Sequence, residues 1–147
     1  MEPLSIDDLV AAGRLEAPAP ATLARLSVEV ARQHIRAVSL LEHPVPALAM
    51  CAVAGRRALV AAAAHRGFAV VVREPVRESE LEEALLVAAT GASPALDELI
   101  PVWQQLVLDA EAAGITKEVT EDDVAAATAL AESMIDIAIA MVDGDTP

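Results

Sequence analysis

Arg56 and Arg57 stand side by side within residues 52–67, AVAGRRALVAAAAHRG, an otherwise apolar run. A guanidinium group binds carboxylates and phosphates through a planar fork of hydrogen bonds. The run predicts a helix, on which neighbouring residues point about 100° apart, so the two arginines cannot share one narrow face. Three interpretations remain open: one arginine pairs with a carboxylate from the second half of the chain, one receives a phosphate or nucleotide in a dimer cleft, or both reach water along their stems. We favour pairing for one arginine and exposure for the other.

The remaining candidates for chemistry are two further arginines and the three histidines of the chain. Arg32 and Arg36 would join Arg56 and Arg57 in an anion-binding cleft. His34 falls on the apolar stripe of its predicted helix, which is typical of a hydrogen-bonded core or interface histidine, although a functional role stays open. His43 and His65 are predicted at helix ends, where the helix dipole favours positive charge.

Other catalytic and metal-binding patterns are missing from the sequence. The carboxylates of residues 78–83, ESELEE, and residues 120–123, TEDD, fall at predicted helix starts, where the helix dipole already explains them. The chain has no Glu-x-x-His pair, Walker loop, Gly-x-Gly-x-x-Gly or Gly-x-Ser-x-Gly. Cys51 is the single cysteine, which excludes an internal disulfide and a thiolate cluster. We therefore expect no metal, no cofactor and no catalytic residue.

Length and composition predict one all-α domain over residues 1–147. The chain is 55% apolar but only 1% aromatic, and alanine is its most frequent residue. Alanine has the highest helix propensity, whereas strands favour aromatic and β-branched residues. We expect an up-and-down bundle of about five helices, preceded by a short lead-in helix and Pro/Ala linker within residues 1–20.

The net charge of −13 is unevenly distributed. Up to Arg77 there are nine basic and seven acidic residues, and from Glu78 onward one basic and sixteen acidic residues. Phosphate backbones are bound by basic surfaces, so the second part of the chain should repel nucleic acid. The N-terminus lacks a signal-peptide pattern, and the longest uncharged apolar run, residues 45–55, is too short to span a bilayer. We expect a cytoplasmic protein.

Hydrophobic periodicity and cap residues predict the positions of the elements. The predicted helices cover residues 5–13, 21–42, 46–66, 78–91, 93–114 and 120–144. Residues 68–72 read as an extended segment packed on the core, because no second strand is evident. Pro101 should kink or divide its helix, and Trp103, on that helix's apolar stripe, should anchor the core.

Three stretches carry a resemblance to a known family. Residues 5–16, SIDDLVAAGRLE, look like a lead-in segment; residues 31–68 look like a helix pair whose alanine-rich second member has a central basic residue and ends at a glycine; residues 115–142 look like a closing helix. Their order resembles the bacterial HEPN domain, as found in some actinobacterial members. The resemblance implies a dimeric helical bundle, which in many members is a ribonuclease of a toxin–antitoxin or phage-defence system and in others binds nucleotides or partner proteins.

The chain departs from this family at the catalytic motif. HEPN ribonucleases carry an arginine and, four to six residues later, a histidine near the start of the last helix, and residues 101–119 contain neither residue type. RNA cleavage without a metal needs a base for the ribose proton and a cation for the phosphate. Arg36 and His43 have the right spacing but belong to a different helix.

Two functions follow from these observations. The first is a catalytically degenerate HEPN-like module, associated with nucleotide or RNA or bound to a partner of antitoxin or nucleotidyltransferase type. The second is an acidic helical interaction protein, such as an antitoxin, immunity factor or assembly subunit, without a nucleotide ligand. In either case we expect a homodimer, because alanine-rich faces permit close helix approach.

Overall fold

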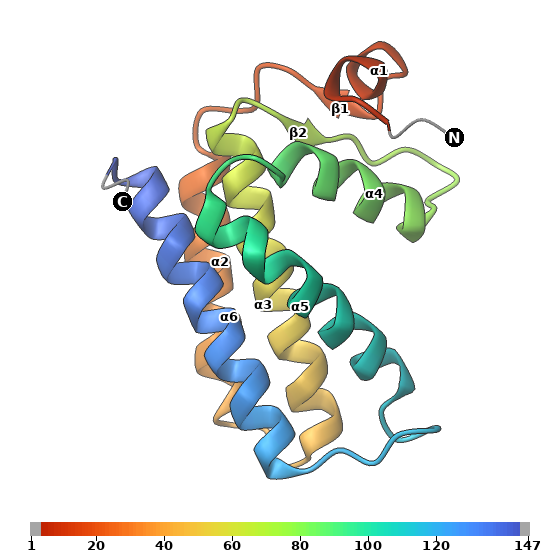
Figure 1. The fold of residues 1–147 in the computed structure, drawn as a ribbon, viewed down its shortest axis with the longest axis vertical. Helices are drawn as coiled ribbons and strands as arrows, with labels where there is room; N and C mark the ends of the chain where they lie inside the picture. The colour runs from red at the N-terminus through yellow and green to blue at the C-terminus, as the bar shows by residue number, and fades with distance from the viewer. Residues whose placement is uncertain (1–3, 145–147) are drawn as a thin grey trace.

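The computed structural model describes residues 4–144 as helices joined by short connections, with one very small sheet (Figure 1). The elements in chain order are α1 (Ile6–Ala11), β1 (Leu15–Glu16), α2 (Leu23–Val38), α3 (Pro44–His65), β2 (Ala69–Val70), α4 (Glu78–Ala89), α5 (Pro94–Ala112) and α6 (Glu121–Val142). The all-α bundle predicted from composition is confirmed.

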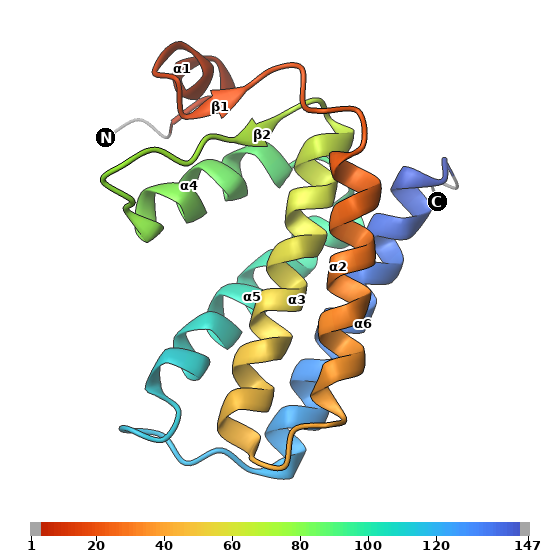
Figure 2. The same ribbon diagram turned by 180° about the vertical axis from the view of Figure 1, so that it is seen from behind.

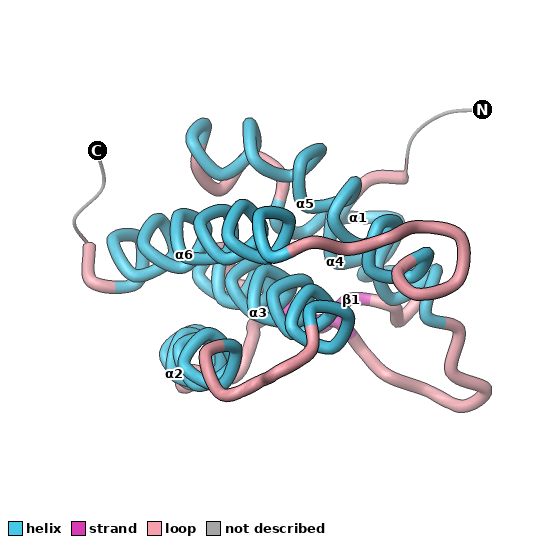
Figure 3. The backbone as a smooth tube through the Cα atoms, turned by 90° about the horizontal axis from the view of Figure 1, so that it is seen from below, coloured by secondary structure: helices cyan, strands magenta, loops and turns pink. Residues whose placement is uncertain are grey.

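Helix α3 is the centre of the bundle. It packs most extensively against α2 and α6, and the view along the bundle places it between these two helices (Figure 3). Half of its 22 residues are buried, and seven of those eleven are alanines. Small side chains let the flanking helices approach closely, as the alanine content predicts.

Helix α5 crosses α3 at Trp103, whose side chain is fully buried. The indole Nε1–H donates to the carbonyl oxygen of Ala52 at 2.9 Å. The ring lies directly over Gly55, because a Cβ built on that glycine would be 2.6 Å from Trp103 Cδ1. The prediction that Trp103 anchors the core is confirmed.

Several helix ends follow the predicted caps. Ser5 with Asp8, and Thr120 with Asp123, form complete capping boxes at the starts of α1 and α6. Ser93, where the predicted helix 93–114 begins, directly precedes α5, but its side chain makes no capping hydrogen bond. Helix α5 continues through Pro101 as one element, so the proline does not divide it.

Helix α2 is shorter than predicted. It ends at Val38 rather than near Glu42, because the amides of Leu40 and Leu41 donate to carbonyls only three residues back and residues 39–43 turn the chain into α3. His43 is consequently the residue before α3, not the last residue of α2.

The predicted isolated extended segment is instead half of a small sheet. Ala69–Val70 pairs antiparallel with Leu15–Glu16, which lies at the same end of the bundle next to α1 and α4 (Figure 2). A two-residue strand has no alternation of apolar and polar residues to detect, which explains why the partner was missed in the sequence.

Two helices, α3 and α6, are long and apolar enough to cross a bilayer by length and composition alone. The apolar run considered in the sequence covered only half of α3. Helices at the centre of soluble bundles meet the same criteria, and 61% of the apolar window of α3 is buried against other helices. The cytoplasmic location stays a prediction.

Candidate functional site

Arg56 and Arg57 have the different environments that their spacing on a helix predicts. Arg56 is half-buried, and its Nη2 lies 3.6 Å from Glu82 Oε1 on α4. Its guanidinium carbon is also 5.5 Å from the centre of the Trp103 ring, within the range of a cation–π contact. Arg57 is exposed. Pairing of one arginine with an acid from the second half of the chain is therefore confirmed.

The other two predicted anion ligands lie on α2. Arg32 and Arg36 are exposed, and Arg32 forms a local ion pair with Glu29 at 3.6 Å. Helix α2 packs against α3 and α6, whereas Arg56 faces α4 and α5. A cleft shared by all four arginines would therefore need a second copy of the chain.

The histidines lie apart from one another. His34 is half-buried on α2, and His65 is exposed in the last turn of α3 as predicted. His43 is exposed at the N-terminus of α3, where the helix dipole disfavours positive charge, so the predicted C-terminal role is wrong. Within residues 4–144 none of the three makes a side-chain hydrogen bond, so the hydrogen bond expected for His34 is not formed with any described residue.

Arg56 opens onto a groove of about 720 Å³ between α3, α4 and α5. This volume is within the range of ordinary ligand sites, roughly 300–1,000 Å³. Half of its twelve lining residues are apolar: Val60 from α3, Val70 from β2, Leu81 and Leu85 from α4, and Val107 and Leu108 from α5. Leu108 is 58% exposed, so the apolar wall reaches the surface. We call this feature the α3–α5 groove.

The charges of the α3–α5 groove are predominantly negative. Glu78, Glu82 and Glu111 line it, and Arg56 is the only cation among its lining residues. Because Arg56 already pairs with Glu82, Glu78 and Glu111 are left without an ion pair among the described residues. A phosphate entering the groove would be repelled, whereas a cationic group would be attracted.

Glu111 was not recognised in the sequence as a candidate. Its signal was present in the spacing of Val107, Leu108 and Glu111, which places two apolar residues and an acid on adjacent turns of one helix. What could not be read was the packing of α4, which supplies the opposite wall.

The remaining reactive groups do not assemble a catalytic site. Cys51 is buried and lies 3.4 Å from the Thr128 hydroxyl; burial raises the pKa of its thiol, an effect that this hydrogen bond opposes. Hydrogen bonds from Gln105 and Lys117 lower the pKa of Asp109, whose carboxylate lies 3.0 Å from Lys117 Nζ. Among residues 4–144 no group of three His, Cys, Asp or Glu side chains is placed to hold a metal ion.

Comparisons of the chain with family models, with curated proteins and with solved structures found no match.

Proposed function

We propose that this chain is a non-catalytic, HEPN-like binding module that receives a basic amphipathic segment of a partner protein in the α3–α5 groove. The observation that carries the proposal is the combination of apolar walls with three glutamates and a single, already paired arginine. Apolar contact would supply affinity, and the carboxylates would select the charge of the partner.

Charge complementarity identifies the chemistry of the occupant. The chain carries a net charge of −13, which attracts a basic segment over distance and accelerates its encounter with the groove. Glu78 lies at the start of α4 and Glu111 near the end of α5, so carboxylates come from both helical walls. A segment with lysine or arginine on its flanks and leucine-like residues between them could pair with the carboxylates of both walls and contact the apolar residues of the groove.

Two large apolar side chains are exposed on α5 and just after it. Leu108 is 58% exposed within α5, and Ile115 is 82% exposed just after that helix ends. Large apolar side chains this exposed, next to an apolar groove, are typical of interaction surfaces. The groove is thus suited to the apolar face of a helix, with successive anchors one turn apart.

The family resemblance adds the biological class to this proposal. If the chain is HEPN-like, its partner would be of antitoxin or nucleotidyltransferase type, and the homodimer would form through helices. The surplus of glutamates in the groove favours the partner-binding form of this function over nucleotide or RNA binding.

The test uses a fluorescein-labelled amphipathic helical peptide of about four turns, with leucines on one face and lysines on the other. Fluorescence anisotropy measures its binding to the purified full chain. We expect saturable binding that Glu78→Gln combined with Glu111→Gln weakens by about tenfold, because two charged contacts are lost. The matched control is Glu132→Gln with Asp136→Asn, which removes two exposed acids of α6 outside the groove.

Equal weakening by the groove pair and the α6 pair would show that only net charge matters, which would contradict the proposal. Absence of peptide binding, or tight binding of a labelled single-stranded RNA instead, would also contradict it. Circular dichroism of each variant checks that the helices remain folded.

A further inference from the structure

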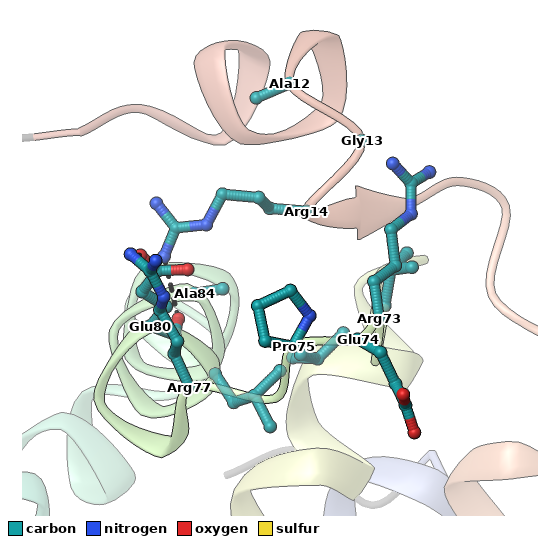
Figure 4. Close-up of a pocket in the computed structure, with 12 residues that line it drawn as sticks. Ala12, Gly13, Arg14, Arg73, Glu74, Pro75, Arg77, Glu80 and Ala84 are labelled. Carbon is teal, nitrogen blue, oxygen red and sulfur yellow. Dashed lines mark hydrogen bonds and ion pairs between the residues drawn. The ribbon is translucent and has the colours of Figure 1, made fainter.

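Three arginines line a second, smaller cavity, beside α4. The cavity measures about 150 Å³ and is lined by the turn after α1, the segment following β2 and the first half of α4. Arg14, Arg73 and Arg77 all line it (Figure 4). Three of the ten basic residues of the chain line this one small cavity, where they outnumber the two lining acids, Glu74 and Glu80. We call it the arginine cavity.

Two of these arginines are anchored to α4 by part of their hydrogen-bonding capacity. Arg14 Nη2 donates to the Glu80 carbonyl oxygen at 2.7 Å and to Glu83 Oε1 at 3.0 Å. Arg77 Nη1 lies 3.4 Å from Glu80 Oε1. A guanidinium has five N–H donors, so the Nη1 and Nε groups of Arg14 and the Nη2 and Nε groups of Arg77 are still available.

Arg73 has no carboxylate partner among residues 4–144. Its guanidinium stands on the opposite side of the cavity from the Arg14 and Arg77 head groups, whereas the carboxylate of neighbouring Glu74 turns away from all three (Figure 4). The glutamates that line or border the cavity on α4, Glu80 and Glu83, are each paired with an arginine. Glu74 also lines the cavity, so three carboxylates balance the three arginines in number. Arg73 is nevertheless the one guanidinium of the cavity without an ion pair among the described residues, and several N–H donors stay free there.

Gly13 makes room for the Arg73 guanidinium. A Cβ at this position would lie 2.9 Å from Arg73 Nη2 and 3.0 Å from Nη1, and the backbone φ of +72° also favours glycine. The turn after α1 thus brings bare backbone, rather than a side chain, against the arginine head group. Arg73 therefore lies against this turn with no carboxylate partner among the described residues.

We propose that the arginine cavity binds a small oxyanion of the phosphate class. Guanidinium groups match the geometry of phosphate oxygens, and donors on two sides of the cavity can hold one tetrahedral anion between them. The volume suits a single phosphate group and is below the roughly 300–1,000 Å³ of sites that enclose a whole nucleotide-sized ligand. The ligand is therefore inorganic phosphate or the terminal phosphoryl group of a small phosphomonoester.

The test is a titration of the ¹⁵N-labelled full chain with sodium phosphate at constant ionic strength, followed by the amide shift of Gly13 and the Nε–H shifts of the arginines. We expect a saturable shift at Gly13, Arg14, Arg73 and Arg77. Arg73→Gln should weaken binding by about tenfold or more, since it removes the one guanidinium of the cavity that is not already paired with a carboxylate. Arg57→Gln, at an exposed arginine of α3 outside the cavity, should leave the affinity within about twofold.

Arg73 is exposed and makes no ion pair with the described residues, so its substitution should leave the fold intact. Arg77→Gln provides a second variant with the same expected direction. A parallel titration with glycerol 3-phosphate separates the two ligand sources: equal affinity identifies a terminal phosphoryl group, and much weaker binding identifies the free ion. Absence of a saturable shift, equal weakening by Arg73→Gln and Arg57→Gln, or acetate binding as tightly as phosphate would overturn the proposal.

Discussion

Position 55 has no space for a methyl group, because Trp103 lies against the bare backbone of α3. A Cβ there would be 2.6 Å from Trp103 Cδ1, 2.8 Å from Nε1 and 3.3 Å from Met134 Sδ. Both neighbouring side chains are fully buried and cannot swing into solvent. We expect Gly55→Ala to lower the free energy of unfolding by about 2 kcal/mol, as measured by urea denaturation, because strain exceeds the gain in helix propensity.

The exposed Ala49 on the same helix provides the control. Ala49→Gly should cost about 1 kcal/mol, so alanine is the better residue at position 49 and glycine at position 55. A Gly55→Ala variant as stable as the natural chain would mean that α5 moves away from α3 easily.

The Cys51 thiol should make stability depend on alkaline pH. Burial raises its pKa from the ordinary value of 9.0, and the negative charge of Glu132 adds to this effect, while the Thr128 hydrogen bond opposes it. In the unfolded chain the thiol loses its proton first, so the contribution of Cys51 is complete below that ordinary value and is lost as pH rises through the raised folded value. Unfolding in urea at about pH 8 and about pH 10, under reducing conditions, measures the loss.

The comparison is with Cys51→Ala, which removes the titrating group. The chain contains no tyrosine and Lys117 is its only lysine, so few other side chains titrate in this window. We expect the natural chain to lose more stability than Cys51→Ala between the two pH values, and identical losses would show that the thiolate is tolerated in the folded state.

The N-terminal ends of α5 and α6 show that a serine or threonine before a helix does not always cap it. Thr120 accepts a hydrogen bond from the Asp123 amide at 3.2 Å and completes a capping box, whereas the Ser93 hydroxyl makes no capping bond. We expect Thr120→Ala to lower the free energy of unfolding by about 1 kcal/mol and Ser93→Ala to change it by much less. Thermal denaturation followed by circular dichroism measures both, and equal losses would contradict the assignment.

The positions of most helices were predictable from capping residues and apolar periodicity. Ser5, Thr120 and the apolar periodicity between them locate the helices, since caps and periodicity act within a few residues of chain. The end of α2 was misplaced because Leu40 and Leu41 continue the apolar pattern beyond the last helical turn. Strand β1 was missed because its pairing depends on residues more than fifty positions away.

The candidate sites were much less predictable than the helices. The pairing of Arg56 followed from the abundance of acids in the second half, but its partner, Glu82, depends on how α4 packs across α3. Nothing in the residues next to Arg14 and Arg73 indicates that the two line the same cavity, because only the β1–β2 pairing brings their segments together. Periodicity reports which face of a helix is buried, not which distant segment covers it.

In the folded molecule, basic residues from the first part of the chain form ion pairs with acids from the second part. The long-range ion pairs among the described residues, Arg14–Glu83, Arg25–Asp143 and Arg56–Glu82, each join a basic residue from before Glu78 to an acid from after it. All are partly exposed, so each contributes roughly 0–1 kcal/mol. They neutralise only a few of the sixteen acids in the second part of the chain.

Repulsion among the remaining carboxylates should therefore dominate the response of the whole molecule to salt. At neutral pH we expect the melting temperature to rise by about 3 °C when NaCl is raised from low to physiological ionic strength, because screening weakens the repulsion more than it weakens the exposed ion pairs. Glu132→Gln with Asp136→Asn removes two exposed acids of α6, and it should raise the melting temperature at low salt and reduce the salt increment. Calorimetry of the natural chain and the variant measures both effects. A melting temperature that falls with salt would mean that the ion pairs between the two halves outweigh the repulsion. The excess acids would then stabilise the fold instead of opposing it.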